Sequence, residues 1–256
     1  MHKMLSLGRT FFLSVFLIVA LSCTHKKNIG AKGCCEGGAA SNIERMSKST
    51  VLITGVATQN ERKIGEWYGS GAVIAHDEKL GSVILTAGHV CTIQGLGPLP
   101  QDADEIKWKL IILDKNEKTQ TVFSAFVSPE FDICLAHVPL MDVPLLEFST
   151  TKPKIGDPII NISSPFGIFS KDLSLIFDGY YSGNLQINSN QSADTYSIPS
   201  GPGASGSPLI NGEGSIVGVI SRSNSQFHHI ILSPTYEEIN NIFSGKAKLE
   251  QVPFSL

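Results

Sequence analysis

Short apolar segments separated by turn residues follow one another from Ser49 almost to the end of the chain. Most alternate apolar with polar positions or are rich in β-branched residues, and Gly, Pro, Asn and Asp stand between them. This pattern is typical of half-buried strands joined by tight turns. About a dozen such segments predict an all-β fold, a sandwich or a pair of barrels. The first six cover residues 49–58, 67–75, 81–90, 106–113, 120–127 and 132–138.

One segment near the end departs from the strand pattern. SPTYEEINNIF, residues 233–243, has Ser233 as a candidate N-cap, Pro234 at the first helical position and acidic residues in the first turns. These are start signals of a helix. The sequence therefore predicts one short C-terminal helix. Strands that do not alternate with helices argue against an α/β fold.

Composition bounds the protein class. The 256 residues are 42% hydrophobic and 17% charged, which is enough apolar material for a packed core and not typical of a disordered chain. The formal net charge is −3. A basic face for nucleic acid is therefore not indicated, and we expect no nucleic-acid partner.

The N-terminus has the pattern of an export signal. Lys3 and Arg9 precede the apolar run FFLSVFLIVAL, which is short for a membrane span. The run ends in ALSC and resembles a bacterial lipoprotein signal whose cysteine, here Cys23, carries the lipid. We expect a signal peptide over residues 1–22, a flexible tether over residues 23–48, and a periplasmic or surface protein attached to the membrane through Cys23. Plain secretion and a retained N-terminal anchor are the alternatives.

The other cysteines do not suggest a metal site. Cys34 and Cys35 stand in the Gly- and Lys-rich tether without further ligands at metal-binding spacing, so we expect exposed thiols there. Cys91 and Cys134 lie in apolar segments, and we expect small buried side chains. We predict no disulfide framework, although the sequence leaves open whether these two cysteines pair. No metal or cofactor is expected.

Three segments carry residues suited to nucleophilic catalysis. His89 directly follows an apolar segment, Asp132 begins another, and Ser205 lies in the glycine-rich stretch GPGASGSP. An imidazole can take the proton of a serine hydroxyl, and a carboxylate can fix the tautomer of that imidazole. Glycine before the serine lets backbone N–H groups point at a developing oxyanion. Gly203 and Ser205 are the candidate donors.

The motifs around these residues resemble the trypsin/chymotrypsin-like serine protease clan. GSGAVIA…ILTAGHV, FDICLAHV and PGASGSPLIN…GSIVGVIS are similar to segments of its bacterial members, the Deg-type proteases and the glutamyl endopeptidases. The resemblance implies two six-stranded antiparallel β-barrels with the active site between them. It places the protease domain at residues 49–244, followed by a tail at 245–256 and no peptide-binding domain.

The resemblance also implies roles for individual residues. His89 corresponds to the general base, Asp132 to the carboxylate that orients it, and Ser205 to the nucleophile. Gly203 and Ser205 correspond to the oxyanion-hole amides. The strand position of Ser221 corresponds to backbone that pairs with an extended substrate. The residues expected to wall the primary pocket are Ile198, Pro199, Ser200, Ser221, Arg222 and Ser223.

Two departures from relatives bear on activation and specificity. Ala204 stands where animal digestive members have an aspartate that captures a new N-terminus, so we expect no activation by that salt bridge. Ile220 stands where glutamyl endopeptidases have a histidine, so preference for glutamate is not indicated. The wall residues include no acid, and we expect a small or apolar residue in the primary pocket.

These observations favour an exported serine endopeptidase that forms an acyl-enzyme. The alternative is a catalytically inactive trypsin-like pseudoprotease that binds peptides or proteins, which Ala204 and an unformed oxyanion turn would permit. An esterase of the α/β-hydrolase type is excluded, because Ser207 replaces the second glycine of the nucleophile elbow and strands do not alternate with helices.

Overall fold

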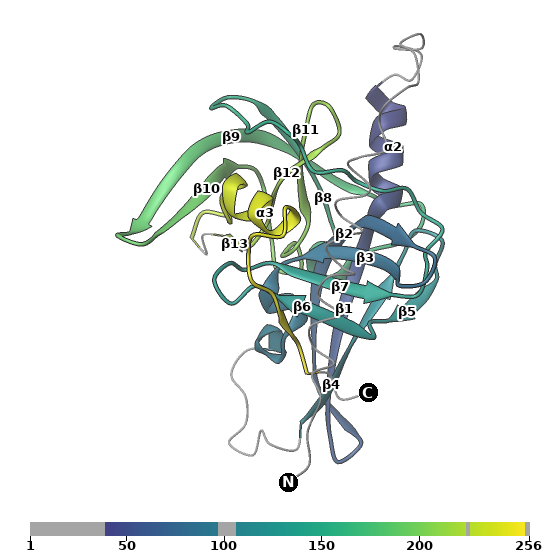
Figure 1. The fold of residues 1–256 in the computed structure, drawn as a ribbon. Coiled ribbons are helices and arrows are strands. Elements are labelled where there is room, and N and C mark those ends of the chain that lie inside the picture. Colours follow the sequence, from purple (N-terminus) through teal and green to yellow (C-terminus); the bar gives the residue numbers. More distant parts are fainter. Residues whose placement is uncertain (1–38, 97–105, 224–225, 254–256) are drawn as a thin grey trace.

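The computed structural model of the chain describes residues 39–96, 106–223 and 226–253. Two curled antiparallel sheets dominate it (Figure 1). The first has the strand order β15-β6-β7-β3-β2-β1-β4-β5 and the second β12-β11-β8-β9-β10-β14-β13. The strands of the first sheet are β1 (Thr50–Gln59), β2 (Arg62–Asp77), β3 (Gly81–Thr86), β4 (Lys107–Leu113), β5 (Thr119–Thr121), β6 (Ser124–Val127), β7 (Cys134–Val138) and β15 (Glu250–Gln251). Those of the second are β8 (Pro158–Ser163), β9 (Leu175–Asn188), β10 (Gln191–Ser197), β11 (Pro208–Asn211), β12 (Ile216–Val219), β13 (Arg222–Ser223) and β14 (Ile230–Ser233).

The predicted all-β fold of two antiparallel barrels is confirmed. The described residues give eight strands in the first sheet and seven in the second, where six were expected in each. The difference comes from β5, β15 and β13, which have only two or three residues each and lie at the ends of the two sheets. Without these short edge strands, each sheet has six.

Three apolar clusters hold the fold together. One fills the first barrel and one fills the second, and a third joins both barrels through side chains such as Leu85 and Leu135 from the first sheet and Ile162 and Val219 from the second. Burial of apolar surface is the main stabilising term in such a core. The junction of the two sheets is therefore a packed interface, and loops at its rim are held in fixed relative positions.

Helix α2 (Ala39–Ser49) corrects the expected extent of the tether. Residues 39–48 were assigned to a flexible tether, but they form a helix whose Met46 is 3% exposed and packs in the cluster shared by both barrels. Arg45 Nη1 also donates to the carbonyl oxygen of Leu145 at 3.1 Å. Burial of Met46 supplies the stability that the polar sequence of this short helix lacks. Cys23, the predicted signal peptide and the first part of the predicted tether lie outside the described residues.

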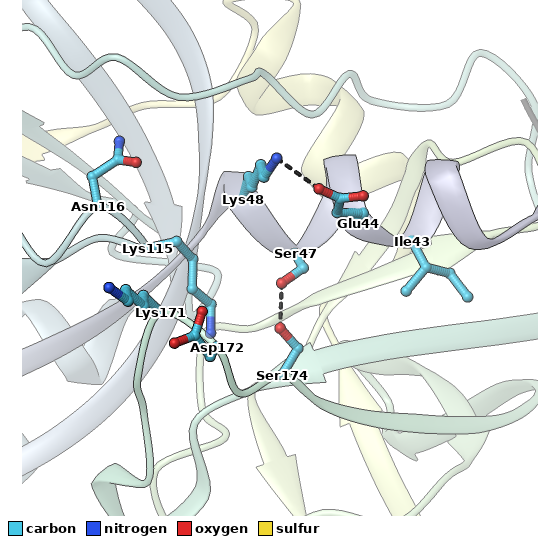
Figure 2. A pocket seen from close by; sticks show the side chains of 9 residues that line it. All are labelled: Ile43, Glu44, Ser47, Lys48, Lys115, Asn116, Lys171, Asp172 and Ser174. Carbon is cyan, nitrogen blue, oxygen red and sulfur yellow. Dashed lines mark hydrogen bonds and ion pairs between the residues drawn. The ribbon is translucent and has the colours of Figure 1, made fainter.

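A hollow of about 600 Å³ lies beside α2, and the residues that line it include none of the predicted site residues (Figure 2). Figure 2 shows Ser47 of α2 hydrogen bonded to Ser174 and Lys48 paired with Glu44. Lys115 Nζ donates to the carbonyl oxygens of Ser170 and Leu173, and burial lowers the pKa of this ammonium. The polar groups here serve to attach α2 and the segment before β9 to the first barrel.

The predicted C-terminal helix is present as α3 (Tyr236–Phe243), but its start was placed too early. Thr235, not Ser233, is the N-cap. Thr235 Oγ1 accepts from the Glu238 N–H, and Glu238 Oε2 accepts from the Thr235 N–H, which is a capping box. Ser233 is the last residue of β14, and its hydroxyl accepts from the Val219 N–H, so it is part of the strand and does not cap the helix. Within the described ranges, neither helix has the length and hydrophobicity needed to cross a membrane.

Candidate active site

His89 and Asp132 form a hydrogen-bonded pair at the junction of the two sheets. His89 lies in a short 3-10 turn, η1 (Gly88–Cys91), just after β3, and Asp132 lies just before β7. His89 Nδ1 is 2.8 Å from Asp132 Oδ2, and the His89 backbone N–H donates to Asp132 Oδ1 at 2.8 Å. An ionised carboxylate only accepts, so Nδ1 carries the proton, and in the neutral imidazole Nε2 keeps its lone pair. The pair is thus arranged for Nε2 to act as a base.

Ser221 completes the surroundings of the carboxylate. Its Oγ donates to Asp132 Oδ2 at 2.5 Å. Burial by itself would raise the pKa of Asp132, but the hydrogen bonds from His89 and Ser221 outweigh it and hold the pKa of this carboxyl below its ordinary value. From the sequence, Ser221 was expected to pair with substrate through its backbone and to wall the primary pocket, not to contact Asp132. Nothing in the local pattern signalled the side-chain contact, because it joins segments 89 residues apart.

A glycine turn holds Ser205 against the strands that carry this pair. Gly206 has φ +85°, and a Cβ there would lie 1.9 Å from Thr86 Oγ1 and 2.3 Å from the Ser70 carbonyl oxygen. Only glycine fits such a close approach. The Gly206 N–H donates to the carbonyl oxygen of Ile220 at 2.7 Å, directly beside Ser221. The turn is therefore packed between the end of β3, just before His89, and the end of β12, just before Ser221.

The backbone before Ser205 is also fixed, and it leaves two donors free. Gly203 has φ +90°, and its carbonyl oxygen accepts from Ser70 Oγ at 2.8 Å. Ser70 Oγ in turn accepts from the Ser164 N–H at 2.9 Å, a bridge that sequence reasoning missed. Among the described residues, the N–H groups of Gly203 and Ser205 donate to no acceptor. Two unused amides beside a hydroxyl can stabilise an oxyanion.

The contact between Ser205 and His89 is not closed. Within the described part of the chain no hydrogen bond joins Ser205 Oγ to His89 Nε2. Such contacts are often long in proteins without substrate and tighten when substrate binds. The structure thus brings the three predicted residues to one junction, with the His–Asp half bonded and the Ser half adjacent to it.

The predicted wall residues fall into different environments. Ile198 was expected to line the primary pocket, but it is fully buried in the cluster inside the second barrel, so its side chain cannot contact a substrate. Strand pairing explains this, since its N–H donates to the carbonyl oxygen of His229 and turns the side chain inward. Pro199 and Ser200 are half-buried, Ser221 is buried, and Arg222 and Ser223 are exposed in β13.

A hollow of about 740 Å³ opens beside the His–Asp pair. Its lining includes His89, Asp132, Phe131, Ser221 and Arg222. Strand β13 borders it at the end of the second sheet, paired with β14 on one side only among the described residues. Over these same residues, no group of three His, Cys, Asp or Glu side chains could hold a metal ion.

Cys91 and Cys134 form a disulfide, a pairing that the sequence had left open. Their expected burial is confirmed, since both are fully buried. Cys91 follows His89 by two residues and Cys134 follows Asp132 by two. The same packing that brings His89 to Asp132 therefore brings the two sulfurs together, a consequence of tertiary contact that neither segment reveals alone.

Comparison with known proteins places this arrangement in a family. The model of the trypsin-like peptidase domain matches residues 69–219, more than half of the chain. A probable periplasmic serine endoprotease, DegP-like, from Pseudomonas fluorescens is 29% identical over 158 residues, 60% of this chain and 29% of that protein. The protein of the same name from Pseudomonas putida is 30% identical over 161 residues, again 60% of this chain and 29% of that one.

A solved structure agrees at the level of the fold. The serine endoprotease from Yersinia pestis is 16% identical, with a TM-score of 0.58, and the match covers 80% of this chain and 65% of that one. The chain spans under a third of the length of the DegP-like relatives that it matches. By the domain match and the double-barrel fold, the chain belongs to the trypsin-like peptidase domain family.

Proposed function

We propose that the protein is an exported serine endopeptidase that hydrolyses peptide bonds through an acyl-enzyme on Ser205. The observation that carries this is the bonded His89–Asp132 pair beside a glycine turn with two unused amides. The names of the DegP-like relatives, which are serine endoproteases, support it. The match spans 29% of the length of such a relative, so the activity is proposed for this chain on its own site geometry.

The proposed reaction follows from the positions of these groups. Ser205 Oγ attacks the carbonyl carbon of the substrate while His89 Nε2 takes its proton. Asp132 stabilises the imidazolium that forms, and the Gly203 and Ser205 N–H groups bind the oxyanion. The tetrahedral intermediate then expels the amine, which receives the proton from His89. Water, activated in turn by His89, releases the acid and restores Ser205.

The edge of the second sheet suits an extended substrate. Strand β13, with Arg222 and Ser223, lies at the end of the sheet next to Ser221, where a peptide can add by backbone hydrogen bonds. The remaining candidate wall residues, Pro199 and Ser200, bring no acid to the primary pocket. We therefore propose a small or apolar residue on the acyl side of the cleaved bond.

Export is supported by the disulfide as well as by the relatives. Structural disulfides form and persist mainly in oxidising compartments outside the cytoplasm, and Cys91 and Cys134 are joined in this way. The DegP-like relatives are named as periplasmic. Attachment to the membrane through Cys23 remains a proposal from the sequence. It is checked by the mass of the protein isolated from its host, and a processed form without acyl groups would refute it.

The proposed activity is tested by labelling with a fluorophosphonate. Such a probe reacts where a serine is activated and an oxyanion site is formed. We expect labelling of the purified protein and none of Ser205→Ala. Labelling that persists in Ser205→Ala would place the reactive serine elsewhere, and a folded wild-type protein without labelling would contradict the proposed activity.

A second candidate function is peptide binding without hydrolysis. This function requires the open contact between Ser205 and His89 to stay open when a peptide binds, because a pseudoprotease keeps the fold but not the working triad. Retained peptide affinity in a protein that neither labels nor cleaves would support this function. Turnover that Ser205→Ala abolishes would exclude it.

A further inference from the structure

We propose that the Cys91–Cys134 disulfide positions His89 on Asp132, so that proteolytic activity depends on oxidation of this cysteine pair. The proposal rests on the function proposed above. It assigns to the disulfide a role in the reaction beyond general stability.

The place of the bond is the first reason. Cys91 is the last residue of η1, the turn that holds His89, and Cys134 is the first residue of β7, the strand that Asp132 precedes. The bond joins these two elements directly, whereas the main chain between the cysteines runs through 43 positions. It is thus a short covalent connection between the base and the carboxylate that orients it.

The kind of attachment that η1 otherwise makes is the second reason. Val90 is buried in the apolar cluster of the first barrel, which packs η1 in place without bonding it to β7. The turn has only four residues. Asp132 accepts the His89 N–H, and the Val90 carbonyl oxygen accepts from Trp67 Nε1 at 3.0 Å. Because the His89 N–H bonds to Asp132 itself, this hydrogen bond cannot fix the position of Asp132 independently of the reacting pair. The disulfide supplies an attachment between the two elements that does not use the reacting groups.

Burial decides when the bond can form. Both cysteines are fully buried within the apolar cluster of the first barrel, beside Ala87 and Val90. A reductant or oxidant therefore reaches the sulfurs only before the barrel closes or when it opens. A protein that folds in an oxidising compartment acquires the bond as it folds, and one that folds in a reducing compartment lacks it. Activity would then follow export.

The oxidant is a disulfide, either of a thiol–disulfide oxidoreductase or of a small molecule. The Cys91 thiolate attacks it and expels one thiolate, which leaves a mixed disulfide. The Cys134 thiolate attacks the Cys91 sulfur and expels the second thiolate. The two cysteines lose two protons and two electrons in total, and the oxidant gains them as two thiols.

The test compares the double variant Cys91→Ala/Cys134→Ala with Ile112→Ala. Ile112 is fully buried in β4 within the same cluster, so its truncation destabilises the same barrel without removing a bond to η1 or β7. Both variants are measured as folded proteins, well below their melting temperatures. The readouts are the fluorophosphonate labelling rate, kcat and KM separately on a peptide substrate, and the low-field proton resonance of an imidazole N–H bonded to a carboxylate.

We expect the double variant to lose about tenfold to a hundredfold in labelling rate and kcat, the size of effect that a misplaced group produces. KM should stay within about twofold, since the substrate edge is untouched, and the low-field resonance should weaken. Ile112→Ala should keep wild-type values in all readouts. A double variant with wild-type kcat and resonance, or an Ile112→Ala variant with equal losses, would overturn the proposal.

A measurement on the wild-type chain covers failure of the double variant to fold. The protein is unfolded and refolded with a thiol reductant, then treated with oxidised glutathione under conditions in which the barrel opens transiently. Labelling of the reduced folded protein should be about tenfold to a hundredfold slower than after oxidation, and equal labelling of the two forms would contradict the proposal. A protein that labels as isolated but does not regain labelling once the bond has formed again would also contradict it. Oxidised protein that never labels, yet shows the low-field resonance only in the oxidised form, would reject the proposed function and retain the positioning role.

Discussion

The two barrels hold their parts of the site by different means. In the first barrel, His89 and Asp132 are held by charge-assisted hydrogen bonds and a nearby covalent bond between Cys91 and Cys134. In the second barrel, Ser205 has no such bond and is held by a backbone turn whose glycines admit close contact with Thr86 and Ser70. We therefore expect the part of the site in the first barrel to respond to protonation and to reduction of the disulfide. The part in the second barrel should respond to added side-chain volume.

We expect the largest effect on activity from removal of the Ser205 hydroxyl or the His89 imidazole. Ser205→Ala and His89→Ala should each lower kcat by about 10⁵- to 10⁶-fold, and the double variant should be hardly worse, because the groups act as a unit. Single-turnover assays on a peptide substrate measure this. Ser182→Ala, an exposed serine of β9 in the same barrel, is the matched control. If the loss in kcat of the double variant equals the product of the two single losses, Ser205 and His89 do not act on the same step of the reaction.

Adding volume to the second half should be the next most harmful change. Gly206→Ala places a Cβ against Thr86 and Ser70 at a φ of +85°, so the turn must move. We expect labelling to fall by at least about 10²-fold, as a displacement of about 1 Å produces, and stability to fall by about 3 kcal/mol or more.

Gly212→Ala is the control for this change, because an added Cβ there has no atom within 4 Å. Its effect on the free energy of unfolding should stay within about 0.5 kcal/mol. Urea denaturation measures both variants. Equal stability of the two would mean that the turn at Gly206 tolerates volume and that the contrast between the barrels is mistaken.

Loss of the covalent bond should lower the stability of the first half. For a closed loop of 43 residues, removal of the disulfide should lower the free energy of unfolding by about 4 kcal/mol. Urea denaturation of Cys91→Ala/Cys134→Ala against the oxidised wild type measures this. A difference below about 1 kcal/mol would show that the bond adds little to the first barrel.

We expect the smallest effect from loss of a hydrogen bond to the charged carboxylate of Asp132. Ser221→Ala removes one hydrogen bond to Asp132 Oδ2, and bonds to charged groups contribute about 1.5–3 kcal/mol, so we expect about a tenfold loss in kcat/KM. The pKa of Asp132 lies below its ordinary value of 3.8, so the ionised carboxylate stabilises the fold above that pH. This contribution disappears as the pH falls through the lower folded pKa.

The difference in stability between wild type and Ser221→Ala should therefore be full near neutral pH and shrink below about pH 4. Urea midpoints measured from pH 7 down to pH 3 provide the check. Thr195→Ala, a half-buried residue of β10 remote in sequence from Asp132, serves as the comparison. A difference independent of pH would mean that Ser221 acts through packing and not through the carboxylate.

Local pattern was sufficient for the fold class and for the residues proposed to react. Alternation of apolar and polar positions determines which faces of a strand can be buried, so it predicted most strands and an all-β fold, and the resemblance to the trypsin-like clan implied the two antiparallel barrels. His89, Asp132 and Ser205 were identifiable because each stands in a distinctive segment. The start of α3 was misplaced because Ser233 and Thr235 are both good caps, and pairing of β14 decided between them.

Only the tertiary structure decided the contacts between segments distant in the chain. The Cys91–Cys134 bond, the Ser221–Asp132 hydrogen bond and the Ser70 bridge depend on which strand ends meet, and that depends on sheet order and register. Burial of Ile198 and helix α2 in place of a tether have the same cause, since packing against distant residues overrides local propensity. The sequence by itself determined the residue types available for chemistry, and the packing of two barrels determined how they are held.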